Sequence, residues 1–519
     1  MKQLAVFLML MGFFTAAKAQ KLSIANIQKS SVLRNSDAIK EGSEVKGYYF
    51  FYVSDKIDRK TNEYTLQIMD QSLNKLKELK FQDSKNVSII ESSFNGTDLV
   101  FLFYNSDDNI LDYQVYGADG TKKFSYTKSI SKKDEAYLRM NYLLDDEDNN
   151  FKGLYPVEGK GFISNVPSRD NKDFTFQISY VGTDAKKQWT YVPAMDGKMF
   201  VGDYLGTHKN VVYVEMLKYS SRFDRNPESF ILGLSLENGK LLFQKSTNEG
   251  KYNFYPISMS VLNDGKAYLY GEFFDKGGNV MKDKSKGFAF VGIDETGKTL
   301  SEKYSTWALD LGKHLGTSGS GKIDDFGYMF LHNMIQTEDG SIYAIGEGYK
   351  KAASGLGIAS TILAGASGSG SSGVSMVKLK VTDMLVIKFD PDFTVKEASI
   401  YKKSDNDIQL LGGSEFVSTQ MLGKQIKYYY SGFDYAYTQV NKDHSSFSIC
   451  YSDFERGKDY KGTTFNSITY SDGKLTQDKI QTKSDATRSI VLPARQGQVL
   501  ILDYYRKDKK IDLHFEKLN

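Results

Sequence analysis

A ten-residue motif that occurs twice constrains the fold of this chain more than any other feature. It has the form x-Asp-Gly-x-x-Tyr-x-x-Gly-Glu at Asn263–Glu272 and again at Glu338–Glu347. The Asp-Gly pair is a strong signal for a tight hairpin, because glycine accepts the positive φ that such a turn requires. The alternating residues after the turn direct one row of side chains into a core and the other row outward. Each copy therefore predicts a hairpin turn that leads into a strand.

Looser copies of this hairpin cover most of the chain. Each copy contains short strands rich in aromatic and β-branched residues, separated by turns that contain Gly, Asp or Asn. The strands of these copies lie within residues 48–79, 98–126, 161–189, 211–243, 263–300, 338–392, 426–475 and 489–515, and each unit also includes a connecting segment. Units of about 45–65 residues with about four strands each are typical of propeller blades rather than of helical solenoids. The sequence therefore predicts an all-β protein, a β-propeller of about eight four-stranded blades.

The last unit shows fewer strands than the others, which predicts how the ring closes. We expect an N-terminal strand within Leu22–Ile27 to complete the last blade. Seven blades is the alternative count, because the segment Gly412–Ser471 is hard to divide into strands. In either case residues 20–519 are expected to form a single propeller domain, in which each sheet buries its faces against two neighbours.

The first 19 residues have the three parts of an export signal. Lys2 supplies the positive charge, Leu4–Met11 forms the apolar run, and Ala17–Ala19 is a small-x-small cleavage site. The apolar run is too short to stay behind as a membrane anchor. We therefore expect a signal peptide at 1–19 and a mature chain that begins at Gln20.

Composition argues against a nucleic-acid partner and against disulfide bonds. Lys and Arg together number 67 and Asp and Glu 64, which gives a formal net charge of only +3. Nucleic-acid binding requires a concentrated basic surface, so we expect no nucleic-acid partner. Cys450 is the single cysteine, so no intrachain disulfide can form. Its position in the apolar strand Phe447–Tyr451 predicts a buried small residue rather than a reactive thiol.

Two segments interrupt the repeat. Ser305–Leu315 carries apolar residues at helical spacing, including Trp307, and predicts a short amphipathic helix. The other is a Gly- and Ser-rich insertion, Ala352–Ser375, with no charged residue between Lys351 and Lys378. Function is best sought at these interruptions, because the repeated motif itself has an evident structural role.

The insertion is the best candidate for a specific role. Its apolar core is about ten residues long, which is too short to cross a bilayer. A segment that contacts a partner or the surface of a membrane is one interpretation, and a flexible or locally packed loop is the other. The candidate partner-contact residues are Leu356, Ile358, Ile362 and Leu363 in the insertion and Trp307 in the predicted helix.

Motifs for catalysis and for cofactors are absent or incomplete. Gly316–Lys322 matches part of a phosphate-binding loop, but Ile323 follows where a Ser or Thr would hold Mg²⁺. The five histidines show no metal-binding spacing, and no Gly-x-Ser-x-Gly elbow occurs. We therefore assign no catalytic, cofactor-binding or metal-binding residue and expect no cofactor. A carboxylate pair that acts on a glycan stays open, since 64 acidic residues offer many pairs.

The Asp-Gly-x-x-Tyr-x-x-Gly repeats at 264–271 and 339–346, together with a signal that ends in Ala19-Gln20, resemble a group of exported repeat proteins common in Bacteroidota. These relatives are β-propeller-like proteins of unknown function, so the resemblance covers most of the mature chain and brings no catalytic residue. Many members that reach the cell surface carry a further C-terminal sorting domain. This sequence ends within a strand unit at Phe515–Asn519, so a periplasmic location is expected, with secretion or outer-membrane association as alternatives.

Three functions follow as hypotheses. The first is a non-catalytic binding or scaffold protein of the bacterial cell envelope, with a protein or glycan ligand on one mouth of the ring. The second is a glycan-active enzyme that uses carboxylates in the central funnel. The third is a structural envelope protein whose insertion at 352–375 makes a peripheral contact with a membrane or a partner. No integral membrane span is expected.

Overall fold

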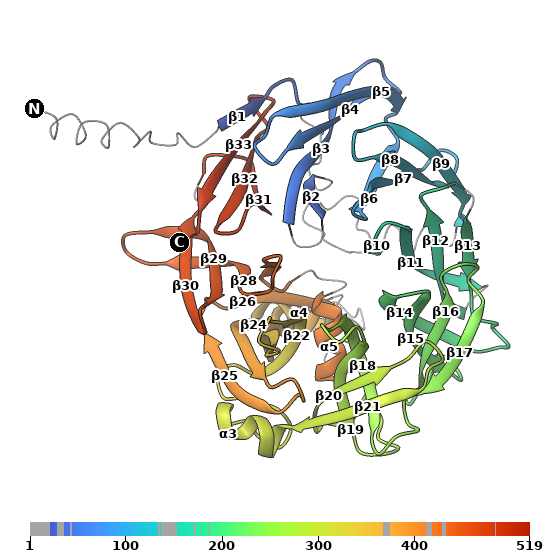
Figure 1. The fold of residues 1–519 in the computed structure, drawn as a ribbon, viewed down its shortest axis with the longest axis vertical. Helices are drawn as coiled ribbons and strands as arrows, with labels where there is room; N and C mark the ends of the chain where they lie inside the picture. Colours follow the sequence, from blue (N-terminus) through green and yellow to red (C-terminus); the bar gives the residue numbers. More distant parts are fainter. Residues whose placement is uncertain are drawn as a thin grey trace, which may run out of the picture.

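The structure is a computed structural model, and it shows a ring of β-sheets (Figure 1). It describes residues 21–28, 36–41, 44–132, 135, 153–170, 173–185, 187–366, 374–411, 418–427, 432–482 and 484–518. The predicted signal peptide at 1–19 lies outside these residues. The described strands form eight antiparallel sheets, seven of four strands and one of five. The chain is therefore an eight-bladed β-propeller, and of the two predicted blade counts eight is confirmed.

Seven of the blades are made of strands that follow one another in the chain, and in blades 1 to 5 the first strand lies nearest the ring axis (Figure 1). Blades 1 and 2 comprise β2 (Asp37–Glu41), β3 (Glu44–Lys56), β4 (Thr61–Asp70), β5 (Lys75–Ser84), β6 (Val87–Phe94), β7 (Asp98–Asn105), β8 (Ile110–Gly117) and β9 (Lys122–Ser129). Blades 3 and 4 comprise β10 (Leu154–Val157), β11 (Gly161–Asp170), β12 (Asp173–Gly182), β13 (Gln188–Tyr191), β14 (Met199–His208), β15 (Val211–Tyr219), β16 (Glu228–Ser235) and β17 (Leu241–Ser246). Blades 5 and 6 comprise β18 (Asn253–Val261), β19 (Ala267–Phe274), β20 (Gly287–Ile293), β21 (Thr299–Thr306), β22 (Tyr328–Gln336), β23 (Ile342–Ala353), β24 (Val374–Phe389) and β25 (Val395–Tyr401), with β26 (Asn406–Leu411) added to β24. Blade 7 comprises β27 (Tyr435–Val440), β28 (Phe447–Arg456), β29 (Lys461–Ser471) and β30 (Lys474–Gln481).

Blade 8 closes the ring by joining the two ends of the described chain. It contains β31 (Arg488–Pro493), β32 (Gln498–Tyr505) and β33 (Lys510–Lys517), and its outermost strand is β1 (Lys21–Ile24). β1 pairs antiparallel with β33, with Leu22 opposite Leu513. Beyond β1 the Ile27 backbone N–H donates to Lys509 O at 2.8 Å, and the Ile27 side chain is fully buried. The predicted closing strand is confirmed.

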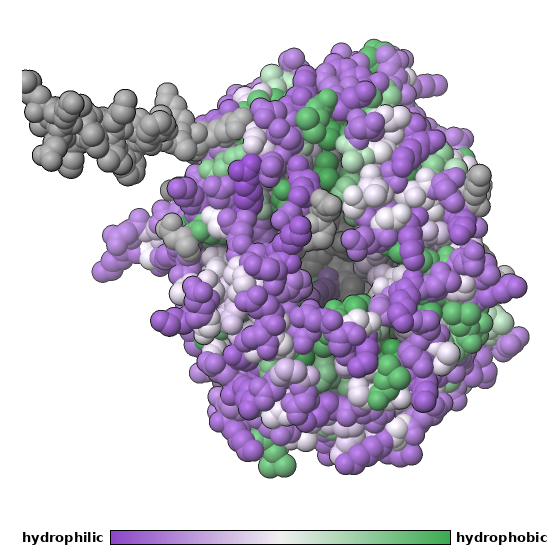
Figure 2. Space-filling model, viewed as in Figure 1, coloured by the Kyte–Doolittle hydropathy of each residue, from purple (hydrophilic) through white to green (hydrophobic). Residues whose placement is uncertain are grey.

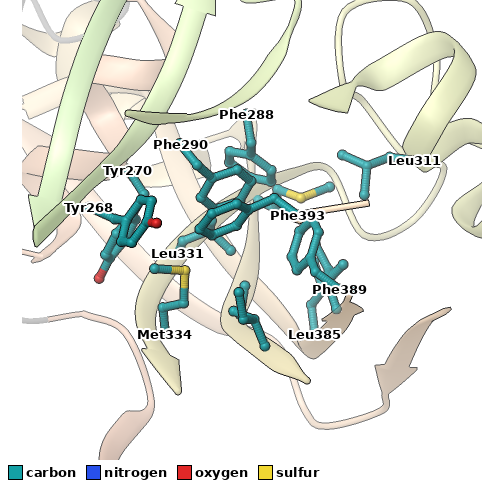
Figure 3. Close-up of a cluster of buried hydrophobic side chains, with 14 of the residues drawn as sticks. Tyr268, Tyr270, Phe288, Phe290, Leu311, Leu331, Met334, Leu385, Phe389 and Phe393 are labelled. Atoms are coloured by element: carbon teal, nitrogen blue, oxygen red, sulfur yellow. The ribbon is translucent and has the colours of Figure 1, made fainter. Parts of the chain in front are cut away.

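Apolar side chains between neighbouring blades form the core. Tyr268 and Tyr270 of the repeated motif project from β19 into a cluster shared by blades 5 and 6 (Figure 3). In the same cluster the rings of Phe290 and Phe393 stack with centroids 4.5 Å apart. Gly265 has a φ of 72°, as the predicted hairpin turn requires. The motif therefore has the structural role that its pattern predicts.

A β-bulge recurs in the innermost strand of five blades. In each, the register between the first and second strands shifts by one residue. The residues that the shift skips are Ile90, Leu205, Ile257, His332 and Ala436. A bulge leaves one residue outside the ladder and bends the strand, so its side chain is directed independently of its neighbours. Four of these residues are apolar and His332 is the exception.

The segment between blades 5 and 6 is helical, as predicted. It comprises η2 (Trp307–Leu311), a single turn of π-helix, and α3 (Gly312–Leu315). Trp307, proposed above as a partner-contact residue, is only 2% exposed. Its ring lies 4.6 Å from that of Phe288, and its Nε1 donates to Ser285 Oγ at 3.0 Å. This contradicts a surface role for Trp307, because the apolar face of the helix covers the core between the two blades.

Candidate functional site

Blade 6 carries a module that the other described blades lack. β23 has 12 residues and β24 has 16, and both extend beyond the four-stranded part of the blade. The extension of β24 pairs with β23 on one side and with β26 on the other, with Val381 opposite both Tyr349 and Asn406. The chain between β23 and β24 forms α4 (Gly355–Ala366), and α5 (Thr419–Gln425) follows β26. Figure 1 shows α4 and α5 close to the centre of the ring.

Helix α4 lies within the insertion Ala352–Ser375 predicted above, of which residues 367–373 lie outside the described residues, and hydrogen bonds hold its start in place. Ser354 is its N-cap, because Ser354 Oγ accepts a hydrogen bond from Gly357 N at 3.0 Å. The same hydroxyl donates to Gln409 Oε1 of β26, and Gln409 Nε2 donates to Ser375 O at 3.1 Å. The predicted loop is therefore a capped helix that is tied to both β24 and β26.

Gly357 determines how closely α4 approaches the sheet. A Cβ atom at this position would lie 1.7 Å from Ser375 O and 2.9 Å from Met376 Cα. Both are backbone atoms, so no flexible side chain can move aside. Gly355, two residues earlier, has nothing within 4 Å of the equivalent position. Only one of these two glycines is thus needed for close contact between helix and strand.

We expect Gly357→Ala to displace α4 from β24 and Gly355→Ala to leave it in place. Both changes replace Gly by the better helix former, so propensity favours the helix equally in the two variants. Hydrogen–deuterium exchange of residues 355–366 measures the difference, with at least about a tenfold faster exchange expected only for Gly357→Ala. Equal exchange in the two variants would contradict this packing.

Exposed apolar side chains lie on this module. Leu356 is 66% exposed and Ile358 is 42% exposed on α4, and Met376 of β24 is also exposed. Ile362 and Leu363 belong to α4, but their side chains lie outside what the structure describes. Figure 2 shows a hollow at the centre of the ring, with hydrophobic side chains beside it where Figure 1 places α4 and α5. Leu356, Ile358 and Met376 are called the α4 face below.

A buried lysine of helix α5 contacts blades 4 and 5. Lys424 Nζ lies 3.1 Å from Asp203 Oδ2 and 3.4 Å from Glu215 Oε2, both on blade 4, and 4.3 Å from the centre of the Tyr255 ring on blade 5. Burial raises the pKa of Glu215 to about 7, although Lys424 acts in the opposite direction. Burial alone would lower the pKa of Lys424, but Glu215, Tyr255 and Asp203 hold it well above its usual value. Lys424 is therefore the charged contact that joins α5 to blades 4 and 5.

The apolar side of α5 covers blade 6. Leu422 of α5 and Ile426, which follows the helix directly, are fully buried in a cluster that includes Phe330 and Tyr349. Tyr349 OH donates to Thr419 O at 2.9 Å at the start of the helix. The helix is thus fixed at both ends by residues of the blades it crosses.

A second buried charge cluster ties the chain after β25 to blades 6 and 7. Lys403 Nζ lies 3.1 Å from Glu347 Oε1 and 2.5 Å from Asp434 Oδ2, and its side chain has no exposed surface. Glu347 also accepts hydrogen bonds from the backbone N–H groups of Asp434 and Tyr435, at 3.1 and 3.2 Å. His332 Nε2 lies 3.3 Å from Glu347 Oε2, and its ring stacks on that of Tyr435 with centroids 4.6 Å apart. The Glu347 carboxylate is therefore surrounded by donors from the protein itself.

The protonation states within this cluster follow from burial. Burial raises the pKa of Asp434 to about 6, against the effect of Lys403, and it also raises the pKa of Glu347. Burial would lower the pKa of Lys403, but the two carboxylates hold it above its usual value. Burial, with Lys427 and Lys403, lowers the pKa of His332 well below its usual value, so the imidazole is neutral at physiological pH.

Three consecutive blades place a buried glutamate at the same register position. Each lies on the second strand of its blade, opposite the first-strand residue that stands two positions before the bulge residue. The three are Glu215, Glu272 and Glu347. Glu272 and Glu347 are the last residues of the two motif copies. These glutamates were not predicted as functional residues, although the repeated Gly-Glu at the end of a strand was the available signal. In blades 4 and 6 this glutamate binds the lysine that anchors the inserted chain.

The cysteine and the phosphate-loop-like run discussed above both lie where they serve the fold. Cys450 is buried in β28 as predicted, and burial raises the pKa of its thiol to about 12. Gly316, the first residue of the phosphate-loop-like run, adopts a φ of 62° and ends α3. Among the described residues, no group of three or more His, Cys, Asp or Glu side chains is placed to hold a metal ion. None of the helices that the structure describes is long and apolar enough to cross a membrane.

Comparisons with known proteins give a family and distant structural likenesses. A family model described as "Family of unknown function (DUF6770)" matches residues 1–519, and no curated protein matches the chain. Prolyl oligopeptidase B from Galerina marginata is 9% identical with a TM-score of 0.36, over 91% of this chain and 56% of that one. This chain thus spans little more than half the length of that peptidase. Quinohemoprotein alcohol dehydrogenase from Comamonas testosteroni is 10% identical with a TM-score of 0.40, over 96% of this chain and 75% of that one. The β-propeller domain of the Trilobed protease from Pyrococcus furiosus is 11% identical with a TM-score of 0.32, over 74% and 95%.

Proposed function

The chain belongs to the DUF6770 family, whose function is unknown, and we propose that it is a non-catalytic binding protein of the bacterial cell envelope. Its ligand is a protein that docks on the α4 face at one mouth of the ring. The mature chain begins at Gln20 after removal of the export signal, and the protein acts in the periplasm. These statements rest on the sequence pattern at 1–20 and on the geometry of the blade 6 module.

The observation that carries this proposal is the exposure of Leu356 and Ile358 on a helix that is rigidly mounted. A capped helix held against β24 loses little conformational entropy when it binds, which favours affinity. Leu356 and Ile358 lie on either side of Gly357, which contacts β24, so they flank the helix rather than share one helical face. A partner that covers the exposed side of α4 therefore contacts both flanks. The propeller then acts as the scaffold that positions the helix.

The charges around α4 favour a protein over a lipid surface. Attachment to an anionic membrane uses free Lys and Arg side chains beside an apolar helix. Here Lys378 and Lys380 of β24 lie 2.5 and 2.7 Å from Asp407 of β26 and from Asp405, which precedes that strand. These two cations are neutralised within the module and add little attraction for phospholipid head groups.

The buried carboxylates favour binding over catalysis. A glycan-active enzyme needs a carboxylate that is open to its substrate and free to exchange a proton. Glu347 and Glu215 have no exposed side-chain surface, and each lies against a lysine of the inserted chain. These groups are therefore suited to fixing the module rather than to acid–base chemistry.

Truncation of the α4 face tests the proposal. We expect the double substitution Leu356→Ser and Ile358→Ser to weaken partner binding at least about tenfold, since loss of about 1.4 kcal/mol is a factor of ten and one buried Leu contributes about 1.5–3 kcal/mol. Leu309→Ser is the matched control, because Leu309 is also 66% exposed but lies on η2, away from the module. Quantitative mass spectrometry of proteins that co-purify from the cell envelope measures the effect.

The same variants separate the alternatives. Loss of the same partner proteins in the double variant, with retention in Leu309→Ser, is the predicted result. An unchanged set of partners would contradict the proposal. If the double variant instead loses binding to vesicles that contain roughly 30 mol% anionic lipid, α4 makes a peripheral membrane contact and the proposal of a protein partner is wrong.

A further inference from the structure

A polar groove lies at the seam where the ring closes. It has a volume of about 660 Å³ and lies between the N-terminal segment Leu22–Gln28 and one face of blade 1. Small-molecule sites in proteins typically have volumes of about 300–1,000 Å³. From blade 1 the groove is lined by side chains of β3, β4 and β5, among them Tyr52, Thr65 and Gln67.

The groove exists because the closing strand is short. β1 has only four residues and ends at Ile24. The chain then turns through Asn26, whose φ is 64°, and Ile27 enters the core between blades 8 and 1. A longer outer strand would extend along blade 1 and cover the outer part of its face. The space it would occupy is the groove.

Alternation along β4 makes the floor of the groove polar. Leu66 and Ile68 point to the other side of the sheet, into the cluster shared with blade 2. Thr65 and Gln67 point to the seam, where both are buried at 1% and 7% exposure. The Thr65 hydroxyl lies beside the Tyr52 hydroxyl. Two polar side chains are thus buried between blades 1 and 8, beside the apolar cluster that these two blades share.

Gln67 has an acceptor that the described residues leave unused. Its Nε2 donates to Glu78 Oε2 at 2.9 Å. A carboxylate only accepts hydrogen bonds, so this contact fixes which end of the amide is nitrogen. Gln67 Oε1 is buried and has no hydrogen-bond partner in the part of the chain that the structure describes. Because an unpaired buried carbonyl is costly, a ligand that donates a hydrogen bond here gains affinity.

The charges that line the groove balance. Asp55, Glu63 and Glu78 face Lys75, Lys80 and Lys509, three groups of each sign. Glu63 lies 3.3 Å from Lys80 and also accepts from Ser54 Oγ at 2.8 Å, and Glu78 lies 3.1 Å from Lys75. Paired charges offer no net field to an ionic ligand. They can still exchange hydrogen bonds with a neutral ligand that both donates and accepts.

We propose that this seam groove is a second binding site and that it takes a neutral polyhydroxylated ligand, a short segment of uncharged glycan. One hydroxyl donates to Gln67 Oε1, and the carbon face of a sugar ring packs against the apolar lining of Tyr52, Met69 and Leu73. The site is independent of the α4 face, because no residue of blade 6 lines the groove.

Binding of neutral trisaccharides to the mature chain tests this proposal. The probes are maltotriose, cellotriose, mannotriose and N,N′,N″-triacetylchitotriose, measured by saturation-transfer NMR and by calorimetry up to about 10 mM, which covers weak sites. Gln67→Met removes the unused acceptor at nearly constant size and is expected to weaken binding at least about tenfold. Gln114→Met is the matched control. Gln114 holds the equivalent register position in blade 2, and both ends of its amide are already bonded, to Asp112, Tyr116 and Lys122.

A blocking variant keeps the test decisive if Gln67→Met fails to fold. Ala25 lines the groove and is exposed, so Ala25→Trp fills the space without entering the core. Binding by one of the four probes that is lost in Gln67→Met and Ala25→Trp and kept in Gln114→Met supports the site. Absence of binding by all four overturns it, as does binding that both variants leave intact. Preference for a charged trisaccharide such as trigalacturonate, abolished by salt, overturns the neutral class of ligand.

Discussion

Replacing Lys403 with Met is expected to lower the free energy of unfolding by about 3–5 kcal/mol, because it leaves two carboxylates buried without their cation. Lys403 Nζ contacts both Glu347 and Asp434, and its side chain has no exposed surface. Chemical denaturation at pH 8 measures the loss. Lys396→Met is the control, since Lys396 pairs with Asp390 at 2.8 Å and both side chains are exposed, at 53% and 39%. Exposed ion pairs contribute only about 0–1 kcal/mol, so little change is expected there.

The loss in Lys403→Met is expected to depend on pH with a definite sign. The pKa of Asp434 is already raised from 3.8 to about 6 in the folded protein, so the folded state binds a proton more tightly than the unfolded chain. Stability from this group is fully present below pH 3.8 and is lost as pH rises through about 6. Without Lys403 the carboxyl pKa rises further, so the variant should be closest to the parent at pH 5 and furthest from it at pH 8. A loss that is equal at the two pH values would contradict the charge cluster.

Ile27→Ala is expected to destabilise the protein by about 2–5 kcal/mol, the range for truncating a fully buried aliphatic side chain. Ile27 lies at the seam and packs in a cluster with Tyr48 of blade 1 and Leu500 of blade 8. A cavity here loosens the seam, where the four-residue strand β1 joins the ends of the ring. Thermal and chemical unfolding measure the effect.

Ile57→Ala is the matched control for the seam, because Ile57 is 44% exposed and lies outside the strands of blade 1. We expect a change within about 0.5 kcal/mol for this surface position. Equal losses in Ile27→Ala and Ile57→Ala would show that the seam does not limit stability.

Local sequence signals predicted the architecture well. The Asp-Gly turns, the aromatic alternation and the incomplete last unit act over a few residues each, and they gave the turn at Gly265, the blade count and the closing strand at Lys21–Ile24. The periodicity of Ser305–Leu315 also predicted a helix. It could not show which face the ring covers, which is why Trp307 was assigned to the surface and is instead in the core.

The candidate site was predictable only in part, since its contacts join distant segments. Glu347 follows directly from the repeated motif, but its partner Lys403 lies in the chain between β25 and β26. A glutamate at the end of a strand looks solvated until that lysine is placed. Helix α4 was not predicted within the insertion, because its glycines disfavour a helix. The Ser354 cap and the close packing at Gly357 offset that propensity and are visible only in three dimensions.

Site-specific photo-crosslinking from the α4 face tests the central claim most directly. The photoreactive residue p-benzoylphenylalanine is placed at Leu356 in one variant and at Leu309 in another, two positions that are each 66% exposed. Irradiation of intact cells that make the protein is followed by analysis of the covalent adducts. The account predicts one discrete protein adduct from Leu356 and none from Leu309. Adducts of equal yield from both positions, or none from Leu356, would contradict a partner-binding role for the α4 face.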